Sequence, residues 1–300
     1  MTCVLVTPWW RVRGTGAGSA WGGVAATRIL DWADPAVREL AAEAERIAGV
    51  AGNARFATDE AAFADGSGLA DNTGPDNAGL SSGVGLASGT GPAGGAGLSS
   101  GIGPAGGSGL AGSAELARLR AAHGVIAAAV RPVYSVRERQ PISRTVRRGR
   151  GSCSQRLAVL EGVARGWGIA TRVGGLAVDG RFWYPRFPRA RFLVPSRVVL
   201  AWPEFFVGGG WLAAGELFGM RPGGPGFAND GEETLFDAVA RTGVDWDGCG
   251  GGVCDLSATV RAELGYFDSR DEVFRRHGQT LCGPLTMLAD PVLSRWSPVR

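Results

Sequence analysis

A low-complexity stretch of glycine, serine, alanine and proline divides this chain and limits how much of it can form a packed core. The stretch runs from about residue 65 to 113 and is almost uncharged. The chain has 50 glycines in 300 residues, and the glycines above the usual number are concentrated in this stretch. It repeats itself, since GLSSGVG at 79–85 returns as GLSSGIG at 97–103 and GPAGGAGL at 91–98 returns as GPAGGSGL at 103–110. Because the repeats lack the apolar side chains of a stacked solenoid, we interpret 65–113 as a disordered insertion.

The region before the insertion, residues 1–64, predicts an α/β segment that belongs to the folded unit. The stretch TRIL at 27–30 reads as a strand, and a helix is expected directly after Asp34. Asp34 suits an N-cap, and Pro35 is well placed in the first helical position. Apolar residues then recur at helical spacing on one face: Val37, Leu40, Ala41, Ala44 and Ile47.

The region after the insertion predicts a mixed core followed by helices, so the order of elements indicates an α+β fold. We expect the core at 114–222, with helical stretches first and then a helix followed by strands from about residue 150. The C-terminal region, 223–300, is expected to be helical. Its three helical patterns are EETLFDAVARTG, DLSATVRAELGYF and DSRDEVFRRHG.

Charge and composition exclude several classes of partner. The net charge is only +3 and every basic residue is arginine, so neither a nucleic-acid partner nor a membrane surface is expected. No apolar run is long enough to span a bilayer, and the first residues lack the pattern of a secretory signal. The five cysteines are scattered and odd in number, so we expect a cytoplasmic protein with reduced thiols.

The octet GRGSCSQR, residues 149–156, predicts a helix that begins at a cysteine. Ser152 and Gln155 fit a capping box, and the apolar residues that follow Cys153 recur at helical spacing until Gly168. A thiol in the first turn lies beside unpaired backbone N–H groups and near several arginines, both of which favour the thiolate. The alternative is a small buried cysteine that only packs the start of the helix.

The surrounding sequence resembles the transglutaminase-like superfamily of papain-related cysteine enzymes. In that family a Gly-x-Cys begins a buried helix, and a Gly-Ile-x-x-Arg motif follows its end. The block at 149–183 has these residues in the same order, namely Gly151, Cys153, Gly168, Ile169, Arg172 and Val173. A second block, RVVLAWPEFFVGGGWL at 197–212, resembles the family's His-Ala-Trp-x-Glu strand and its Gly-Trp hairpin. The resemblance covers roughly residues 114–220 and implies a Cys helix packed on an antiparallel sheet.

The same resemblance implies that part of the catalytic set is missing. The family's general base is the histidine of the second block, and here Leu200 occupies that position while Ala201 and Trp202 stay in register. The orienting aspartate falls on Gly215, with Glu216 next to it as a candidate acidic partner. Leucine cannot accept a proton, and without a base that later acts as an acid the expulsion of an amine is severely slowed.

Three functions therefore stay open. The first is a degenerate transglutaminase-like protein that binds a partner or acts as a scaffold through the Cys153 pocket. The second is a thiol-dependent acyl transferase or peptidase that attacks an amide or ester through Cys153, with Glu216 or Glu204 as an unusual partner. The third is a zinc-stabilised interaction module, with Cys249, Cys254, His277 and Cys282 as ligands.

The alternative to a zinc site is that Cys249, Cys254, His277 and Cys282 are unrelated side chains, and on that interpretation no cofactor is expected. The only other histidine, His123, lies on a helical stretch and reads as an ordinary helix position. For binding, the candidates are Trp202, Trp183 and Arg189, the last in an arginine-rich loop expected at 184–197. The partner they would bind is expected to be an unknown protein or peptide.

Overall fold

The computed structural model describes residues 21–64, 106–219, 226–247 and 254–281, together with isolated positions between 286 and 295. The repeats of the predicted insertion lie almost entirely outside these residues. Where the described chain resumes at Gly106, it is already helical, so a helix begins inside the stretch expected to be insertion.

The centre of the fold is a four-stranded antiparallel sheet in the order β5–β4–β3–β8. Its strands are β3 (Thr171–Asp179), β4 (Arg197–Val207), β5 (Gly210–Ala213) and β8 (Val260–Phe267). Strands β3 and β4 pair without a break from Thr171 opposite Phe205 to Asp179 opposite Arg197. Because side chains alternate along a strand, Ala201 shares a face with Thr171, whereas Leu200 and Trp202 belong to the other face.

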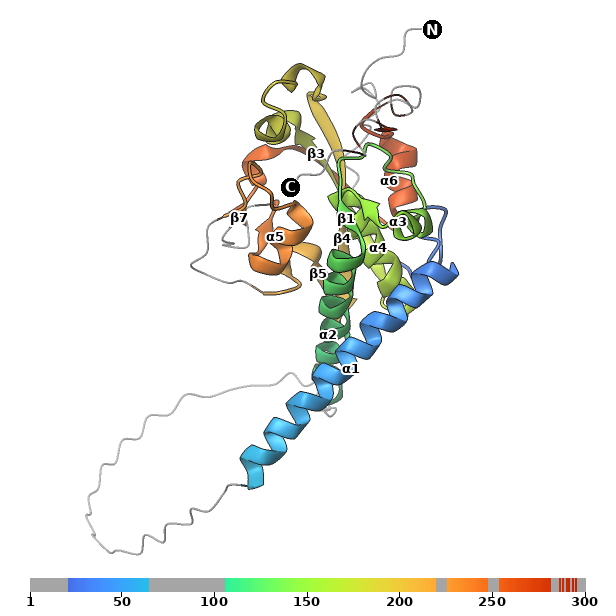
Figure 1. Cartoon of the computed structure of the whole chain (residues 1–300), viewed down its shortest axis with the longest axis vertical. Coiled ribbons are helices and arrows are strands. Elements are labelled where there is room, and N and C mark those ends of the chain that lie inside the picture. The colour runs from blue at the N-terminus through green and yellow to red at the C-terminus, as the bar shows by residue number, and fades with distance from the viewer. Residues whose placement is uncertain are drawn as a thin grey trace, which may run out of the picture.

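Six helices and two pairs of short strands surround this sheet in the described part of the chain (Figure 1). The helices are α1 (Pro35–Ala64), α2 (Gly106–Ala129), α3 (Ile142–Arg148), α4 (Cys153–Gly166), α5 (Leu235–Arg241) and α6 (Arg270–His277). The short strands are β1 (Arg131–Pro132) with β2 (Arg150–Gly151), and β6 (Val244–Asp245) with β7 (Cys254–Asp255). Four short 3₁₀-helices complete it: Gly180–Arg186, Arg191–Leu193, Ala214–Glu216 and Ser257–Thr259.

Helix α4 is the central helix, and nearly all of its residues are buried. It packs on β3 and β4, with α2 and α3 beside it, while α1 lies along α2 and extends away from the rest of the molecule (Figure 1). An α+β fold with a cysteine helix packed on an antiparallel sheet is therefore confirmed.

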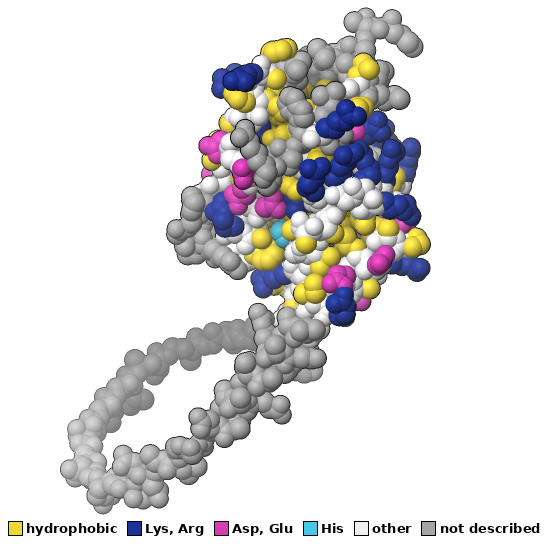
Figure 2. Space-filling model, in the orientation of Figure 1, with side chains coloured by type: hydrophobic (Ala, Val, Ile, Leu, Met, Phe, Trp, Pro, Cys, Tyr) yellow, Lys and Arg dark blue, Asp and Glu magenta, His cyan; other side chains and the backbone are white. Residues whose placement is uncertain are grey.

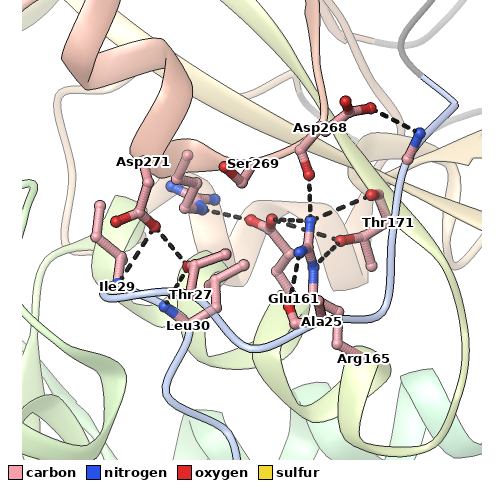
Figure 3. Close-up of polar contacts among 12 residues, drawn as sticks. Ala25, Thr27, Ile29, Leu30, Glu161, Arg165, Thr171, Asp268, Ser269 and Asp271 are labelled. Carbon is pink, nitrogen blue, oxygen red and sulfur yellow. Dashed lines mark hydrogen bonds and ion pairs between the residues drawn. The ribbon is translucent and has the colours of Figure 1, made fainter.

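Buried charges fix α4 to the sheet and to α6 (Figure 3). The Glu161 carboxylate, fully buried, accepts a hydrogen bond of 2.5 Å from Arg270 Nε and lies 3.6 Å from Arg165 Nη2. Arg165 also donates to Thr171 Oγ1 at 2.7 Å and to the Asp268 carbonyl at 2.5 Å. A buried charge needs such partners to offset its lost hydration, so this network fixes where α4 lies.

Two predicted elements differ from the structure. The stretch DLSATVRAELGYF was expected to be helical, but it holds β8, which pairs with β3 from Val173↔Phe267 to Val178↔Val260. The prediction was wrong because an open edge of β3 selects an extended partner over local helical spacing. The expected strand at 27–30 is also wrong. These residues are irregular, and Ile29 is buried with its carbonyl bonded to the Ile142 N–H.

The helices after the insertion otherwise follow the sequence patterns. Helix α5 begins after Thr234 and α6 after Ser269, and both caps accept a backbone N–H through their side chains. Helix α1 begins at Pro35, with Asp34 Oδ1 accepting the Ala36 N–H at 3.0 Å, as predicted. Across the described residues, no helix has the length and apolar character needed to cross a membrane.

Candidate functional site

Cys153 is the first residue of α4, where the sequence predicted it. Ser152 Oγ accepts the Gln155 N–H at 3.2 Å, and Gln155 Oε1 accepts the Ser152 N–H at 3.0 Å. This reciprocal pair is the predicted capping box, and it is confirmed. The thiol therefore sits at the N-terminal end of a well-formed helix.

The half-buried thiol has polar neighbours that come from three separate segments. Glu138 lies ahead of α3, and its Oε2 accepts a hydrogen bond of 2.6 Å from Ser154 Oγ. Arg186 ends the first 3₁₀-helix after β3 and Tyr134 follows β1, and each of these two residues interacts electrostatically with Cys153. A carboxyl, a phenol and a guanidinium therefore lie near enough to the thiol to interact with it electrostatically.

The balance of these neighbours keeps the thiol protonated. Burial and then the Glu138 carboxylate raise the pKa of Cys153 to about 11, although Arg156, the Ser154 N–H and Arg186 lower it. The expectation of a stabilised thiolate is therefore wrong. The free energy lost when the thiolate is removed from water is larger than the stabilisation that the helix N-terminus and the nearby cations provide.

The arginines near Cys153 in sequence explain part of this result. Arg147 binds Asp34 at 2.6 Å, and Arg148 Nη1 donates to Gln140 Oε1 at 3.0 Å. Arg156 lies 3.0 Å from Asp237 and stacks over the Phe236 ring at 4.2 Å. Each of these arginines has another partner, and of the three only Arg156 still lowers the Cys153 pKa, by less than burial and Glu138 raise it.

Glu138 is the residue that the sequence analysis missed. Burial is the largest cause that raises the pKa of its carboxyl, opposed by the Ser154 hydrogen bond and by Arg270. The contact forms because β1 and β2 pair in parallel, which closes the segment between them into a loop over the start of α4. Nothing in the local sequence around Glu138 signals this contact, which depends on a pairing between residues 131–132 and 150–151.

Neither histidine is a partner of the thiol. His123 Nε2 lies 2.7 Å from the Phe236 carbonyl, its ring stacks on Phe236, and burial lowers its pKa. His277, at the end of α6, packs edge-on against Phe267 at 5.5 Å, and burial with Arg197 and Arg276 lowers its pKa. Within the described residues, the charged groups that act on Cys153 are Glu138, Arg156 and Arg186.

The residues of the second block lie on the sheet and its hairpin. Leu200 is buried in β4 opposite Leu176, and Gly215 lies in the 3₁₀-helix after β5. A Cβ atom built on Gly215 would lie 2.1 Å from the Val244 carbonyl oxygen, so the backbone leaves no space there for an aspartate. Glu216 caps the same turn by accepting the Ala213 N–H at 3.2 Å.

The remaining candidates separate into buried and exposed groups. Glu204 is ion-paired with Arg172 at 2.7 Å. Trp202 is buried, and its ring centroid lies 5.6 Å from that of Trp246. Trp183 is half-buried, and its ring centroid lies 4.8 Å from that of Phe182. Arg189 is exposed in the loop between β3 and β4, and from that loop it is the charge of Arg186 that acts on the thiol.

The candidate zinc ligands are only partly described. Cys249 and Cys282 lie outside the described residues. Cys254 is buried, where its sulfur accepts the Phe227 N–H at 3.3 Å and donates to the Phe227 carbonyl at 3.7 Å. In the ranges that the structure covers, no three histidine, cysteine or carboxylate side chains gather as a metal site would require.

Comparison with known proteins places the core in a family. Residues 111–215 match the family model described as the transglutaminase-like superfamily. Neither a curated protein nor a solved structure matches the chain significantly. The matched region runs from α2 to the 3₁₀-helix after β5, and so includes Cys153, α4, β3 and β4. The chain therefore contains a domain of the transglutaminase-like superfamily.

Proposed function

We propose that this transglutaminase-like domain is a degenerate member of its superfamily, which binds a protein or peptide partner or acts as a scaffold around the Cys153 pocket. The observation that carries the proposal is the setting of the thiol. A carboxyl group, Glu138, and not an imidazole stands beside it, and the thiol pKa is about 11. A protonated thiol without a histidine partner lacks both the nucleophile and the base of conventional amide chemistry.

The hairpin supports the same proposal. A Cys–His pair also needs a group that orients the imidazole, and the backbone at Gly215 excludes any side chain at the position that the resemblance assigns to it. Leu200, at the position that the resemblance assigns to the base, is buried among apolar residues. Restoring the conventional set would therefore require a change in the backbone as well as two side chains.

The test is the pH dependence of thiol alkylation by iodoacetamide, followed at Cys153 by peptide mass spectrometry. Because the thiolate is the reactive form, we expect slow alkylation near neutral pH and a rate that rises about tenfold per pH unit towards the pKa of about 11. Cys153→Ala identifies the signal of this residue among the five cysteines. Rapid alkylation of Cys153 near neutral pH would contradict the proposal.

A second variant tests the cause of the raised pKa. Glu138→Gln removes a negative charge that opposes thiolate formation, so we expect the Cys153 pKa to fall and alkylation to become faster at a given pH. Glu39→Gln, at an exposed position of α1, removes the same charge elsewhere and should leave the profile unchanged. An unchanged profile in Glu138→Gln would show that burial alone sets the pKa.

A thiol-dependent acyl transferase or peptidase is the second candidate, and one observation favours it. Cys153 keeps its capped helix terminus, and Glu138, Tyr134 and Arg186 are close enough to interact with it electrostatically. In that case Glu138 replaces Glu216 and Glu204 as the acidic partner, since those two bind the Ala213 N–H and Arg172. Activity that is lost in both Cys153→Ala and Glu138→Gln would support this candidate over the first.

A zinc-stabilised module is the third candidate. Metal analysis of the purified protein tests it directly, because a structural zinc site would retain one ion per chain, and Cys254→Ser would lose it.

A further inference from the structure

A concave site lies away from Cys153, over the sheet face that carries Trp202. It is a cavity of about 400 Å³ between the sheet and the segment around β6. Its walls include the rings of Trp202, Trp246 and Tyr266 and five carboxylates, with no basic side chain among the described residues that line it. Helix α4 bonds to Thr171 on the opposite face, so the cavity and the cysteine helix use different faces of the sheet.

Some carboxylates of this cavity are paired with a neighbouring cation, and others are not. Glu204 is already paired with Arg172. Glu216 and Glu263, both exposed at the cavity, form no ion pair with any residue that the structure describes. A concave site with uncompensated negative charge and aromatic walls favours a cationic ligand, because carboxylates and the faces of aromatic rings both attract cations.

At the edge of the cavity, an arginine of the protein itself already stacks on one of the lining rings. The Arg172 guanidinium lies 4.1 Å from the ring centroid of Tyr266 and 4.4 Å from that of Trp211, while it is paired with Glu204. Tyr266 and Glu204 are both cavity residues. A planar guanidinium suits this combination, since it stacks on rings and binds carboxylates through two N–H groups at once.

Trp246 supplies an independent sign that a ligand is missing. Its side chain lines the cavity and the residue is only 7% exposed, yet its indole Nε1 is buried with no hydrogen-bond acceptor among the described residues. A buried donor without an acceptor is costly, and such groups are rare in folded proteins. After a small shift of the ring, the carbonyl oxygen of a bound peptide would accept this N–H.

We propose that the cavity lined by Trp202, Trp246, Tyr266 and Glu263 binds an arginine side chain of a peptide or protein partner. The guanidinium stacks against the aromatic walls and pairs with Glu263, and the adjacent peptide carbonyl accepts the Trp246 N–H. This site extends the proposed binding role and identifies the chemistry of the partner, without any part for the thiol.

The experiment uses the full-length protein and two small probes, N-acetyl-arginine amide and N-acetyl-citrulline amide, with binding followed by NMR saturation transfer and by tryptophan fluorescence. Citrulline has nearly the shape of arginine but no charge. We expect the arginine probe to bind at least tenfold more tightly than the citrulline probe and to weaken as salt is added. Equal binding of the two probes, or binding of neither at about 10 mM, would overturn the proposal.

Variants then locate the site. Glu263→Gln should weaken arginine binding about fivefold, and Trp246→Phe, which keeps the ring and removes the N–H, should weaken it about threefold. Glu39→Gln, with the same loss of charge on α1, should bind as the wild type does. If Glu39→Gln weakens binding as much as Glu263→Gln, the effect is one of net charge, and the site assignment fails.

The thiol variant keeps this proposal separate from the preceding one. Cys153→Ala should bind the arginine probe with unchanged affinity, because the cavity lies on the other face of the sheet. Loss of binding in Cys153→Ala would reject a separate site, whereas a reactive thiol with intact arginine binding would reject only the degenerate role of Cys153.

Discussion

Gly215 shows at the scale of one residue why this domain departs from the pattern of its superfamily. The sequence places a glycine where the resemblance implies an orienting carboxylate, which by itself reads as the loss of a side chain. The structure adds that the backbone has closed over the position, since the Val244 carbonyl of β6 lies against the glycine. The departure therefore involves packing as well as chemistry.

This close contact predicts a large cost for the smallest substitution. Gly215→Ala places a Cβ atom 2.1 Å from the Val244 oxygen, so the turn or β6 must move, and we expect unfolding free energy to fall by about 3 kcal/mol. Urea denaturation followed by circular dichroism measures it. Gly210→Ala in β5 is the control, because no atom lies within 4 Å of its Cβ position, and it should change stability little. Equal effects of the two substitutions would contradict the close contact.

The residue scale also shows what the sequence can and cannot predict about a thiol. The capping box needed only residues 152–155, and it was predicted correctly because caps are local. The thiol pKa depends first on burial and then on Glu138, and both result from strand pairing and loops that cover the start of α4. Those contacts come from the tertiary fold, so the sign of the shift was beyond local reasoning.

At the scale of elements, α4 combines a capped start with a charged middle and end. Glu161 and Arg165 lie one turn apart on the helix and meet Arg270 from α6 and Thr171 from β3 (Figure 3). The amphipathic spacing predicted the helix, but charged residues on a helix normally indicate a solvated face. Here they are fully buried, and they join α4, β3 and α6 into one unit.

This network predicts the effect of removing its single carboxylate. Glu161→Gln leaves Arg165 and Arg270 buried without the carboxylate that pairs with both, and we expect a loss of about 3–5 kcal/mol in unfolding free energy. Glu233→Gln is the matched control, since its pair with Arg241 is about one-third exposed on both sides and should be worth less than about 1 kcal/mol. A loss below about 1 kcal/mol in Glu161→Gln would show that the two guanidinium groups are satisfied by carbonyls alone.

Strand β8 is the element that sequence reasoning assigned wrongly. Its residues carried helical spacing, and only the unpaired edge of β3 explains the extended conformation. The helices around it were predicted well because each has its own cap and apolar face. Elements whose stability is local were found from the sequence, and the strand that depends on a distant partner was not.

At the scale of the whole molecule, segments from both ends of the described chain meet. The Thr27 hydroxyl donates to Asp271 Oδ2 at 2.5 Å, and the Gly22 N–H donates to Asp268 Oδ1 at 3.0 Å. Charge is distributed unevenly over the surface, and Figure 2 shows arginine side chains gathered around α3 and α6 on one face. The acidic cavity and this basic area give a chain of net charge +3 two distinct electrostatic regions.

The repeated segment predicts a result at this scale. It lacks the apolar residues of a core, so replacing residues 66–104 by a glycine–serine linker of roughly twenty residues should change unfolding free energy by less than about 1 kcal/mol. Urea denaturation of the two full chains provides the comparison. A loss of several kcal/mol would show that the repeats form part of the folded unit.

The contact between Gly22 and Asp268 has a consequence for biosynthesis. A ribosome releases the residues of β3 and β4 long before those of β8 and α6, so β3 keeps an open edge and Arg165 lacks the Asp268 carbonyl during that interval. A nascent chain that has emerged only as far as the hairpin after β4 exposes the edge of β3 as a template for association with other chains until β8 pairs with it.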